Sequence, residues 1–204
     1  MQSQLLRVAL FIIGIIIVIA SSDNPPNGRT GAPFDGTCND CHGGTNPGGY
    51  AGTVAISGLP DPVSPNTTYP VTLTVTVTGG NPVRSGFQLV AVQGNNTNAG
   101  DLTAVNGEAG TEMLGGREYI DHRNPKNFGG NPTVSWTFNW TSPASSSGGV
   151  VTFYFTANLA NGSGSSGDLI IFGSQTFNHS GATPLSTSIT NVVNVSSIRG
   201  AEGS

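Results

Sequence analysis

Apolar and polar residues alternate along much of this chain of 204 residues. The clearest case is 69–78, YPVTLTVTVT, in which Leu73 and three valines face one way and the threonines face the other. Segment 133–140, TVSWTFNW, places both tryptophans of the chain and a phenylalanine on one side. A period of two is typical of strands that bury one face. We therefore predict strands over both segments, with the aromatic face of the second in the core.

The same alternation predicts further strands at 53–57, 85–93, 150–160, 168–177 and 188–197. Clusters of Gly, Pro, Asn and Ser, such as GLPDPVSPN and NGSGSSG, separate these segments and are typical of turns. No segment shows the 3.6-residue period of an amphipathic helix. Strands spaced by turn signals, without intervening helices, favour an all-β fold, an antiparallel β-sandwich.

The chain begins with a segment that is typical of export. Arg7 precedes an apolar run from Val8 to Ala20, and small residues follow, with Ala20 and Ser22 suited to a signal-peptidase site. The run is shorter than the roughly 20 residues of a membrane span. We predict a cleaved secretory signal peptide, no stable membrane span after cleavage, and a secreted or cell-surface protein. An uncleaved N-terminal anchor is the alternative.

Composition agrees with an exported protein and excludes some partners. Only 9% of the residues are charged, and the net charge is −4 with a pI near 5.1. Nucleic-acid binding needs clustered Lys and Arg, so we expect no nucleic acid. After the signal peptide at 1–22 we predict an irregular Gly/Pro-rich arm at 23–50, one sandwich domain at 51–180, and a tail at 181–204 that adds a strand.

The arm contains the only two cysteines, in the sequence Cys38-Asn-Asp-Cys41-His42. A disulfide between them suits an oxidising compartment, but it closes a small loop and leaves His42 unexplained. A zinc site needs four ligands, so the distant His122 and His179 would have to complete it. Covalent haem attachment uses both thiols and the histidine. This third hypothesis explains the whole motif, and the other two stay open.

Longer stretches of the chain show a resemblance to known families. The segment TGAPFDGTCNDCHGG resembles the start of the bacterial choice-of-anchor V domain proteins, whose arm carries the same Cys-x-x-Cys-His. Segments SPNTTYPVTLTVT, WTFNWTSP and GGVVTFYFTANLANGSGSSGD are similar to that family and to the reelin-type (reeler) domain of animal extracellular proteins. The resemblance implies an immunoglobulin-like, reeler-like β-sandwich that is secreted or surface-displayed. The C-terminal NVVNVSSIRGAEGS departs from the sorting anchor of many members.

A bound haem would need a second axial ligand besides His42. His122 is our first candidate, because the resemblance aligns it with a recurring histidine and because EYIDHRNPKN predicts a turn-rich segment outside any strand. His179 is second and Met113 third. A ligand from a neighbouring copy of the chain is a further alternative. The carboxylates of Asp35, Asp40 and Asp121 are expected to be solvated.

No nucleophile elbow, phosphate loop or paired-carboxylate motif is present, so we expect no enzyme. The sequence favours a secreted c-type monohaem protein, with one covalent haem c, that transfers electrons extracellularly. Its partners would be a redox protein or neighbouring copies in a homo-oligomer or filament. The alternative is a surface adhesion or structural module in which Cys38 and Cys41 form a disulfide and no haem is bound.

Overall fold

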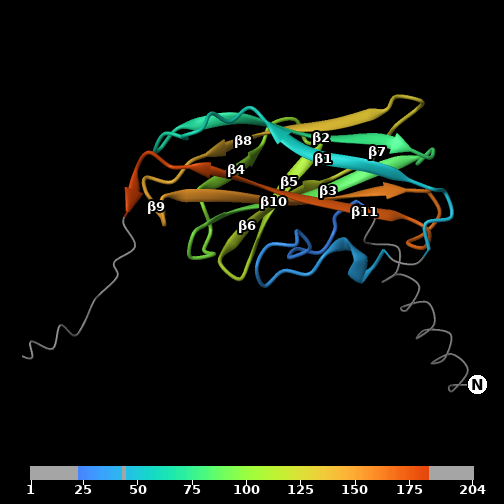
Figure 1. Cartoon of the computed structure of the whole chain (residues 1–204), viewed down its shortest axis with the longest axis horizontal. Helices are drawn as coiled ribbons and strands as arrows, with labels where there is room; N and C mark the ends of the chain where they lie inside the picture. Colours follow the sequence, from blue (N-terminus) through green and yellow to red (C-terminus); the bar gives the residue numbers. More distant parts are fainter. Residues whose placement is uncertain (1–22, 43–44, 184–204) are drawn as a thin grey trace, which may run out of the picture.

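The computed structural model describes residues 23–42 and 45–183, which form two packed β-sheets (Figure 1). The first sheet contains, in spatial order, β1 (Ala51–Ser57), β2 (Thr68–Gly79), β8 (Thr133–Thr141) and β4 (Asp101–Ala104). The second contains β11 (Leu169–Asn178), β10 (Val150–Ala160), β3 (Arg84–Gln93), β6 (Arg117–His122) and β5 (Ala109–Leu114), and β7 (Lys126–Asn127) pairs with β3.

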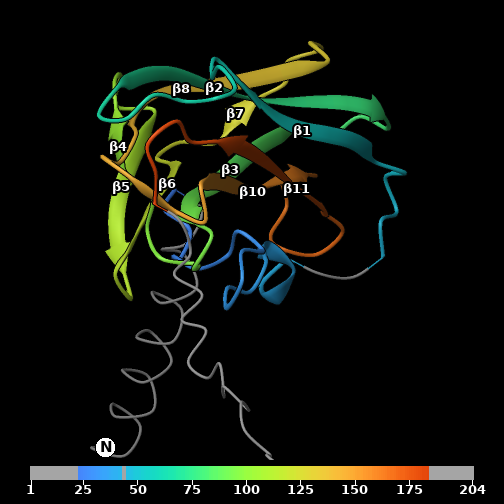
Figure 2. The same cartoon turned by 60° about the vertical axis from the view of Figure 1, so that its left-hand side comes forward.

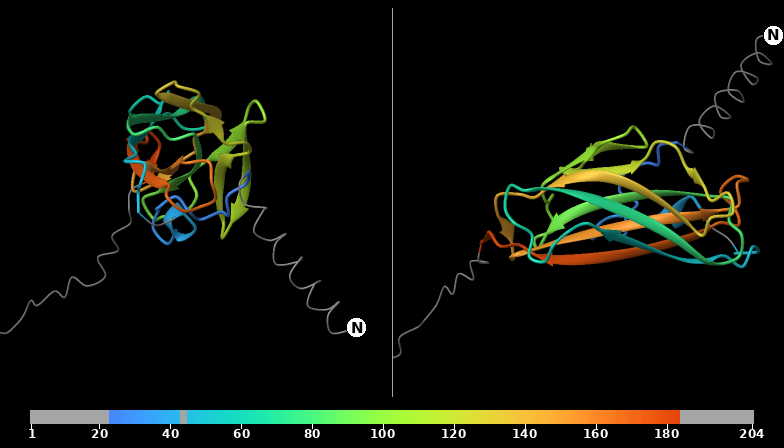
Figure 3. Two further views of the ribbon diagram at one scale, coloured as in Figure 1. Left: turned by 90° about the vertical axis from the view of Figure 1, so that its right-hand side faces the viewer. Right: turned by 90° about the horizontal axis from the view of Figure 1, so that it is seen from above.

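All pairs within these two sheets are antiparallel, which confirms the predicted all-β sandwich. The longer strands run along the long axis of the molecule, as the view from above shows (Figure 3). The short strands β9 (Ser146–Ser147) and β12 (Ala182–Thr183) form a separate parallel pair. Within the described ranges, no helix has the length and apolar character needed to cross a membrane.

The strands predicted between residues 53 and 177 are present, but the prediction missed the β5–β6 hairpin. Its two-residue turn is Gly115-Gly116, with φ of 59° and 82°, and positive φ at both positions is what a tight hairpin of this kind requires. The sequence of β5 does not alternate clearly between apolar and polar residues. The strand lies at the edge of the sheet, where its last three residues are exposed and no alternate set of side chains has to be buried. The predicted signal peptide and the strand at 188–197 lie outside the described residues.

The core lies between the two sheets. Trp136, Phe138 and Trp140 of β8 are buried against Phe87 of β3 and Phe153 of β10, as the period-two pattern predicted. Each aromatic side chain removes a large apolar area from water, so this cluster supplies much of the free energy of folding.

The arm covers the outer face of the six-stranded sheet, on the side away from β1, β2 and β8 (Figures 1 and 2). Ala32 of the arm packs against Val90, Val92 and Tyr119, which form a second buried cluster separate from the main core. Strand β3 is therefore buried on both faces along nearly its whole length.

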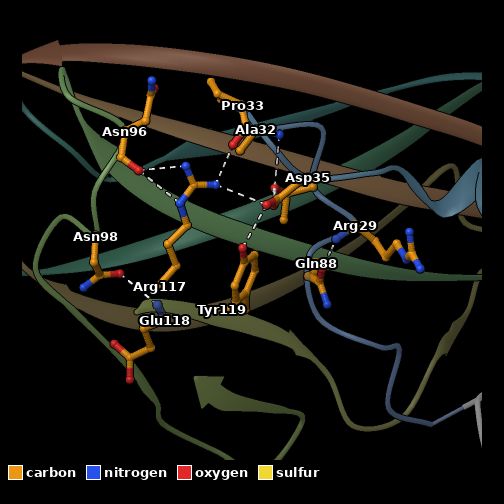
Figure 4. A network of polar contacts seen from close by, with 11 residues as sticks. Arg29, Ala32, Pro33, Asp35, Gln88, Asn96, Asn98, Arg117, Glu118 and Tyr119 are labelled. Carbon is orange, nitrogen blue, oxygen red and sulfur yellow. Dashed lines mark hydrogen bonds and ion pairs between the residues drawn. The ribbon is translucent and has the colours of Figure 1, made fainter. Parts of the chain in front are cut away.

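Buried hydrogen bonds hold the arm in place (Figure 4). Asp35 accepts bonds from the Arg117 guanidinium at 3.1 Å, the Tyr119 hydroxyl at 2.9 Å and the Thr30 hydroxyl at 2.6 Å. The expectation that Asp35 is solvated was wrong, because its side chain is only 5% exposed. Asp40 is 45% exposed, as expected, and pairs with Arg29.

Candidate cofactor site

The Cys-x-x-Cys-His segment forms one compact helical turn. Residues Cys38–Asp40 are a 3-10 helix, and the His42 amide donates to the Cys38 carbonyl at 2.8 Å. Side chains three and four positions apart lie on the same side of such a turn. The spacing alone thus brings Cys38, Cys41 and His42 to one side of the arm.

The two cysteines differ in exposure and are not bonded to each other. Cys41 is exposed, whereas burial, followed by the neighbouring Cys41 sulfur, raises the pKa of Cys38 to about 12. A redox-active dithiol needs a thiolate with a lowered pKa. The environment of Cys38 therefore disfavours thiol–disulfide chemistry at neutral pH.

A carboxylate from the far end of the chain holds the ring of His42. Asp168, which directly precedes β11, places Oδ2 2.8 Å from His42 Nδ1, and its side chain is fully buried. Its Oδ1 accepts the Asn161 amide at 2.9 Å, and its Oδ2 accepts the Asn158 side-chain amide at 3.1 Å. Sequence reasoning missed this contact because 126 residues separate its two partners and no local pattern signals it.

His122 is the last residue of β6, so the expectation that it lies outside any strand was wrong. Its ring lies over Gly86 of β3, where a Cβ atom would overlap it. Nδ1 is 3.0 Å from the Phe87 amide nitrogen and 3.1 Å from the Phe87 carbonyl oxygen. The backbone pairing of β3 with β6 ends at Gln88, one residue after Phe87 in the sequence. The His122 ring therefore contacts the backbone of Phe87, where a paired strand would otherwise supply a backbone partner.

The motif and His122 line the same cavity, of about 440 Å³, between the arm and the outer face of the six-stranded sheet. The arm contributes Pro25, Pro26, Arg29, Cys38, Cys41 and His42. The sandwich contributes Arg84, Ser85, Gly86, Phe87, His122, Pro125, Asn158, Ala160, Gly162, Gly164, Ser165 and Asp168. The fold thus brings together the first-choice pair of axial ligands from positions 80 residues apart in the sequence.

The other two ligand candidates lie elsewhere. His179 follows β11, at the opposite end of the β10–β11 hairpin from Asp168, and both ring nitrogens have backbone partners, the Pro143 carbonyl and the Gly181 amide. Met113 is 64% exposed on the edge strand β5 and does not line the cavity. A zinc site that needs His179 beside the two cysteines is not assembled in this arrangement.

No group of three or more His, Cys, Asp and Glu side chains within residues 23–42 and 45–183 is placed to hold a metal ion by itself. A haem iron makes a smaller demand on the protein, because the porphyrin supplies the equatorial ligands and the chain supplies only the axial ones. His42 and His122 are the two histidines among the described residues that line this cavity.

No protein-family model matches the chain, and no curated protein matches it. Among solved structures, it is similar to the human F-spondin reeler domain, at 21% identity and a TM-score of 0.42, covering 67% of this chain and 94% of that one. The Reelin-N domain of F-spondin gives 21% identity and a TM-score of 0.44, covering 70% and 94%.

A cohesin module from Clostridium perfringens gives 15% identity and a TM-score of 0.43, covering 66% of this chain and 99% of that one. Because every one of these TM-scores is below 0.5, the sandwich described above rests on the sheets of this chain alone. The resemblance to choice-of-anchor V proteins stays a prediction.

Proposed function

We propose that this chain is an exported c-type monohaem protein that transfers electrons outside the cell. Each thiol, Cys38 and Cys41, adds across one vinyl C=C bond of the porphyrin, so that sulfur bonds one carbon and the thiol hydrogen passes to the other. His42 and His122 are the axial ligands. The haem would supply reversible one-electron chemistry, and the chain binds it, orients it and shields it from water.

The observation that carries this proposal is the shared cavity. A covalent-attachment motif could lie anywhere on the surface, yet here its three side chains line a cavity together with His122. The volume of about 440 Å³ is within the range of roughly 300–1,000 Å³ typical of ligand and cofactor sites. Two imidazoles in one cavity suit a six-coordinate, low-spin iron.

The polar lining also fits the group. Arg29 and Arg84 both line the cavity, and guanidinium groups pair well with carboxylates such as the two propionates of a haem. The Nε atom of Arg29 and the Oδ1 atom of Asn158 are buried without a hydrogen-bond partner among the described residues. Unpaired buried polar atoms are costly, so a polar ligand in this cavity would relieve that cost.

Electron transfer is a better match than catalysis for this site. Two strong axial ligands leave no open iron position for a substrate, so we propose no enzymatic activity. Cys41 is exposed and the His42 side chain is 32% exposed, so one edge of the site lies at the surface. A redox partner, or a neighbouring copy of the chain, could approach that edge.

The test is covalent haem attachment. The full chain is expressed for export in a host that matures c-type cytochromes, and haem is measured by the pyridine haemochrome spectrum and by peroxidase staining of a denaturing gel. Wild type and the control Asn39→Ser, which changes a residue between the cysteines, should carry one haem. Cys38→Ser and Cys41→Ser should lose most of it. A wild-type chain without a Soret band contradicts the proposal.

The second ligand has its own test. His122→Ala should convert the iron from low spin to high spin, or allow it to bind carbon monoxide, as read by optical and electron paramagnetic resonance spectra. His179→Ala is the matched control, because it removes a buried histidine whose contacts are with the backbone and not with the cavity. If His122→Ala keeps the wild-type spectrum, the second ligand comes from another residue or from a neighbouring copy.

One observation favours a second function, that of a surface adhesion or structural module. The bonds of Asp35 with Arg117 and Tyr119 hold the arm without any contribution from a cofactor. If the protein is such a module and binds no haem, the two cysteines would form a disulfide. A colourless wild-type protein with no free thiol before reduction, and two after it, would support this alternative.

A further inference from the structure

We infer that Asp168 is a positioning residue for the haem iron, which fixes the tautomer of His42 and lowers the reduction potential of the site. This inference rests on the proposed function, since it concerns the same cavity. It adds a residue that the attachment motif does not contain and that acts through His42 rather than on the iron.

The first step is the direction of the hydrogen bond between the two side chains. Asp168 Oδ2 lies 2.8 Å from His42 Nδ1, and both Asp168 oxygens already accept bonds, from the Asn161 amide and the Asn158 side chain. A carboxylate in this setting acts as an acceptor. The proton of the shared bond therefore belongs to His42 Nδ1, which leaves the lone pair on Nε2.

The second step is the strength of the contact. The Asp168 side chain is fully buried and the bond itself is partly buried, so the carboxylate is fixed in place and holds the ring against rotation. The Asn158 amide nitrogen lies 3.2 Å from the same ring nitrogen and donates to Asp168, so it supports the carboxylate from the adjacent strand. Bonds to charged groups in buried sites are stronger than those between neutral groups.

The third step is the effect on the iron. A carboxylate that accepts the Nδ1 proton makes the other ring nitrogen a more basic ligand. A more basic ligand, together with a buried negative charge nearby, stabilises ferric iron relative to ferrous iron. The reduction potential should consequently be lower than it would be without Asp168.

The His122 side of the cavity provides a contrast. There Nδ1 faces both a backbone donor and a backbone acceptor of Phe87, at nearly equal distances. At His42 the acceptor that faces the same ring atom, Nδ1, is a buried carboxylate, and a charged acceptor forms a stronger bond than a backbone carbonyl.

The experiment compares three variants of the full-length haem protein. Asp168→Asn should keep covalent haem but raise the midpoint potential and increase the high-spin fraction, because an amide is a weaker acceptor for the Nδ1 proton. Asp168→Glu should restore much of the wild-type value. Asp40→Asn is the matched control: it removes one negative charge next to Cys41 from a side chain that is 45% exposed and pairs with Arg29. Equal potentials in Asp168→Asn and Asp40→Asn would overturn the inference.

A second measurement separates this inference from the proposed function and does not depend on any variant at Asp168. Nitrogen NMR of the wild-type chain in its haem-free form reports which ring nitrogen of His42 carries the proton. A proton on Nδ1 supports the positioning role, and a proton on Nε2 alone overturns it. If the wild-type chain carries no covalent haem, the proposed function is overturned, and the predicted effect on the reduction potential is overturned with it. The NMR result would still show whether His42 donates its Nδ1 proton to Asp168.

Discussion

At the centre of the six-stranded sheet, along β3, both faces are buried, but by different chemistry. The inner face carries apolar side chains, such as Leu89 and Phe153, packed against the other sheet. The outer face carries buried polar side chains, among them Gln88, Asp121 and Thr156, beneath the arm. The difference teaches that one strand can build a core and a polar site at once, because alternate side chains point to opposite faces.

Gly86 shows how the outer face makes room for the cavity. It has no side chain, and the ring of His122 occupies the space where a Cβ atom would stand. Asn158 of β10 is paired with Gly86 across the two strands, and its side-chain nitrogen lies 3.2 Å from Nδ1 of His42, which belongs to the arm. A larger residue at position 86 would displace His122, so the site depends on this glycine as well as on its polar members.

The inner face should dominate stability, which is the largest effect we predict. Phe153→Ala removes a fully buried ring that packs on Trp140 and Phe177, and should lower the free energy of unfolding by about 4 kcal/mol. Urea denaturation of the full-length chain measures this change. Phe172→Ala on β11, where the ring is 65% exposed, is the control and should stay within about 0.5 kcal/mol of wild type. Similar losses in both variants would contradict the assignment of the core.

The outer face should depend on the buried pair between Asp35 and Arg117. Asp35→Asn leaves the Arg117 charge buried without its carboxylate, which should cost about 3 kcal/mol. Faster hydrogen exchange at the arm amides of Gly31 and Gly36, together with urea unfolding, would report this loss. Asp40→Asn breaks a partly exposed pair of the same type and should cost less than about 1 kcal/mol. If arm exchange is unchanged in Asp35→Asn, other contacts hold the arm.

The inner face could be predicted from the sequence, and the outer face could not. Alternation placed Trp136, Phe138 and Trp140 in the core because period two and apolar character coincide there. Asp35 and Asp121 were expected to be solvated, and both are buried. Nothing local in the sequence shows that the arm folds back over the sheet, since Asp35 and Arg117 are 82 residues apart.

The candidate site divides in the same way. The sequence identified the motif of Cys38, Cys41 and His42 but placed it in an irregular arm, and the helical turn that brings the three side chains to one side was not predicted. The contact of His42 with Asp168, and the position of His122 over Gly86, depend on strand order and register. Pairings between strands distant in sequence are set by the whole fold, so no local pattern contains them.

The smallest predicted effect concerns Asp121, which is buried on β6. This ionisable side chain on the outer face should make the stability of the protein depend on pH, which the apolar side chains of the inner face do not. Burial raises the pKa of this carboxyl to about 7, although Arg123, 3.6 Å away, opposes the shift. Neither of its oxygens has a hydrogen-bond partner among the described residues. A carboxyl whose pKa is raised in the folded state binds more protons there than in the unfolded chain between about pH 4 and pH 7. Its contribution to stability is therefore fully present below pH 4, and falls as the pH rises to 7.

Asp121→Asn should remove this dependence. The free energy of unfolding of the variant, relative to wild type, should increase by about 2 kcal/mol between pH 4.5 and pH 8, because the variant has no carboxyl to ionise. Urea unfolding of both chains across that range measures the difference, in which the contributions of the histidines common to both largely cancel. Glu112→Gln is the control, because the pKa of that exposed carboxyl is lowered by its bonds to Asn24 and Arg123. It should leave the difference between pH 4.5 and pH 8 nearly flat. A flat difference for Asp121→Asn as well would show that Asp121 is already ionised in the folded protein at low pH, and that its pairing with Arg123 outweighs its burial.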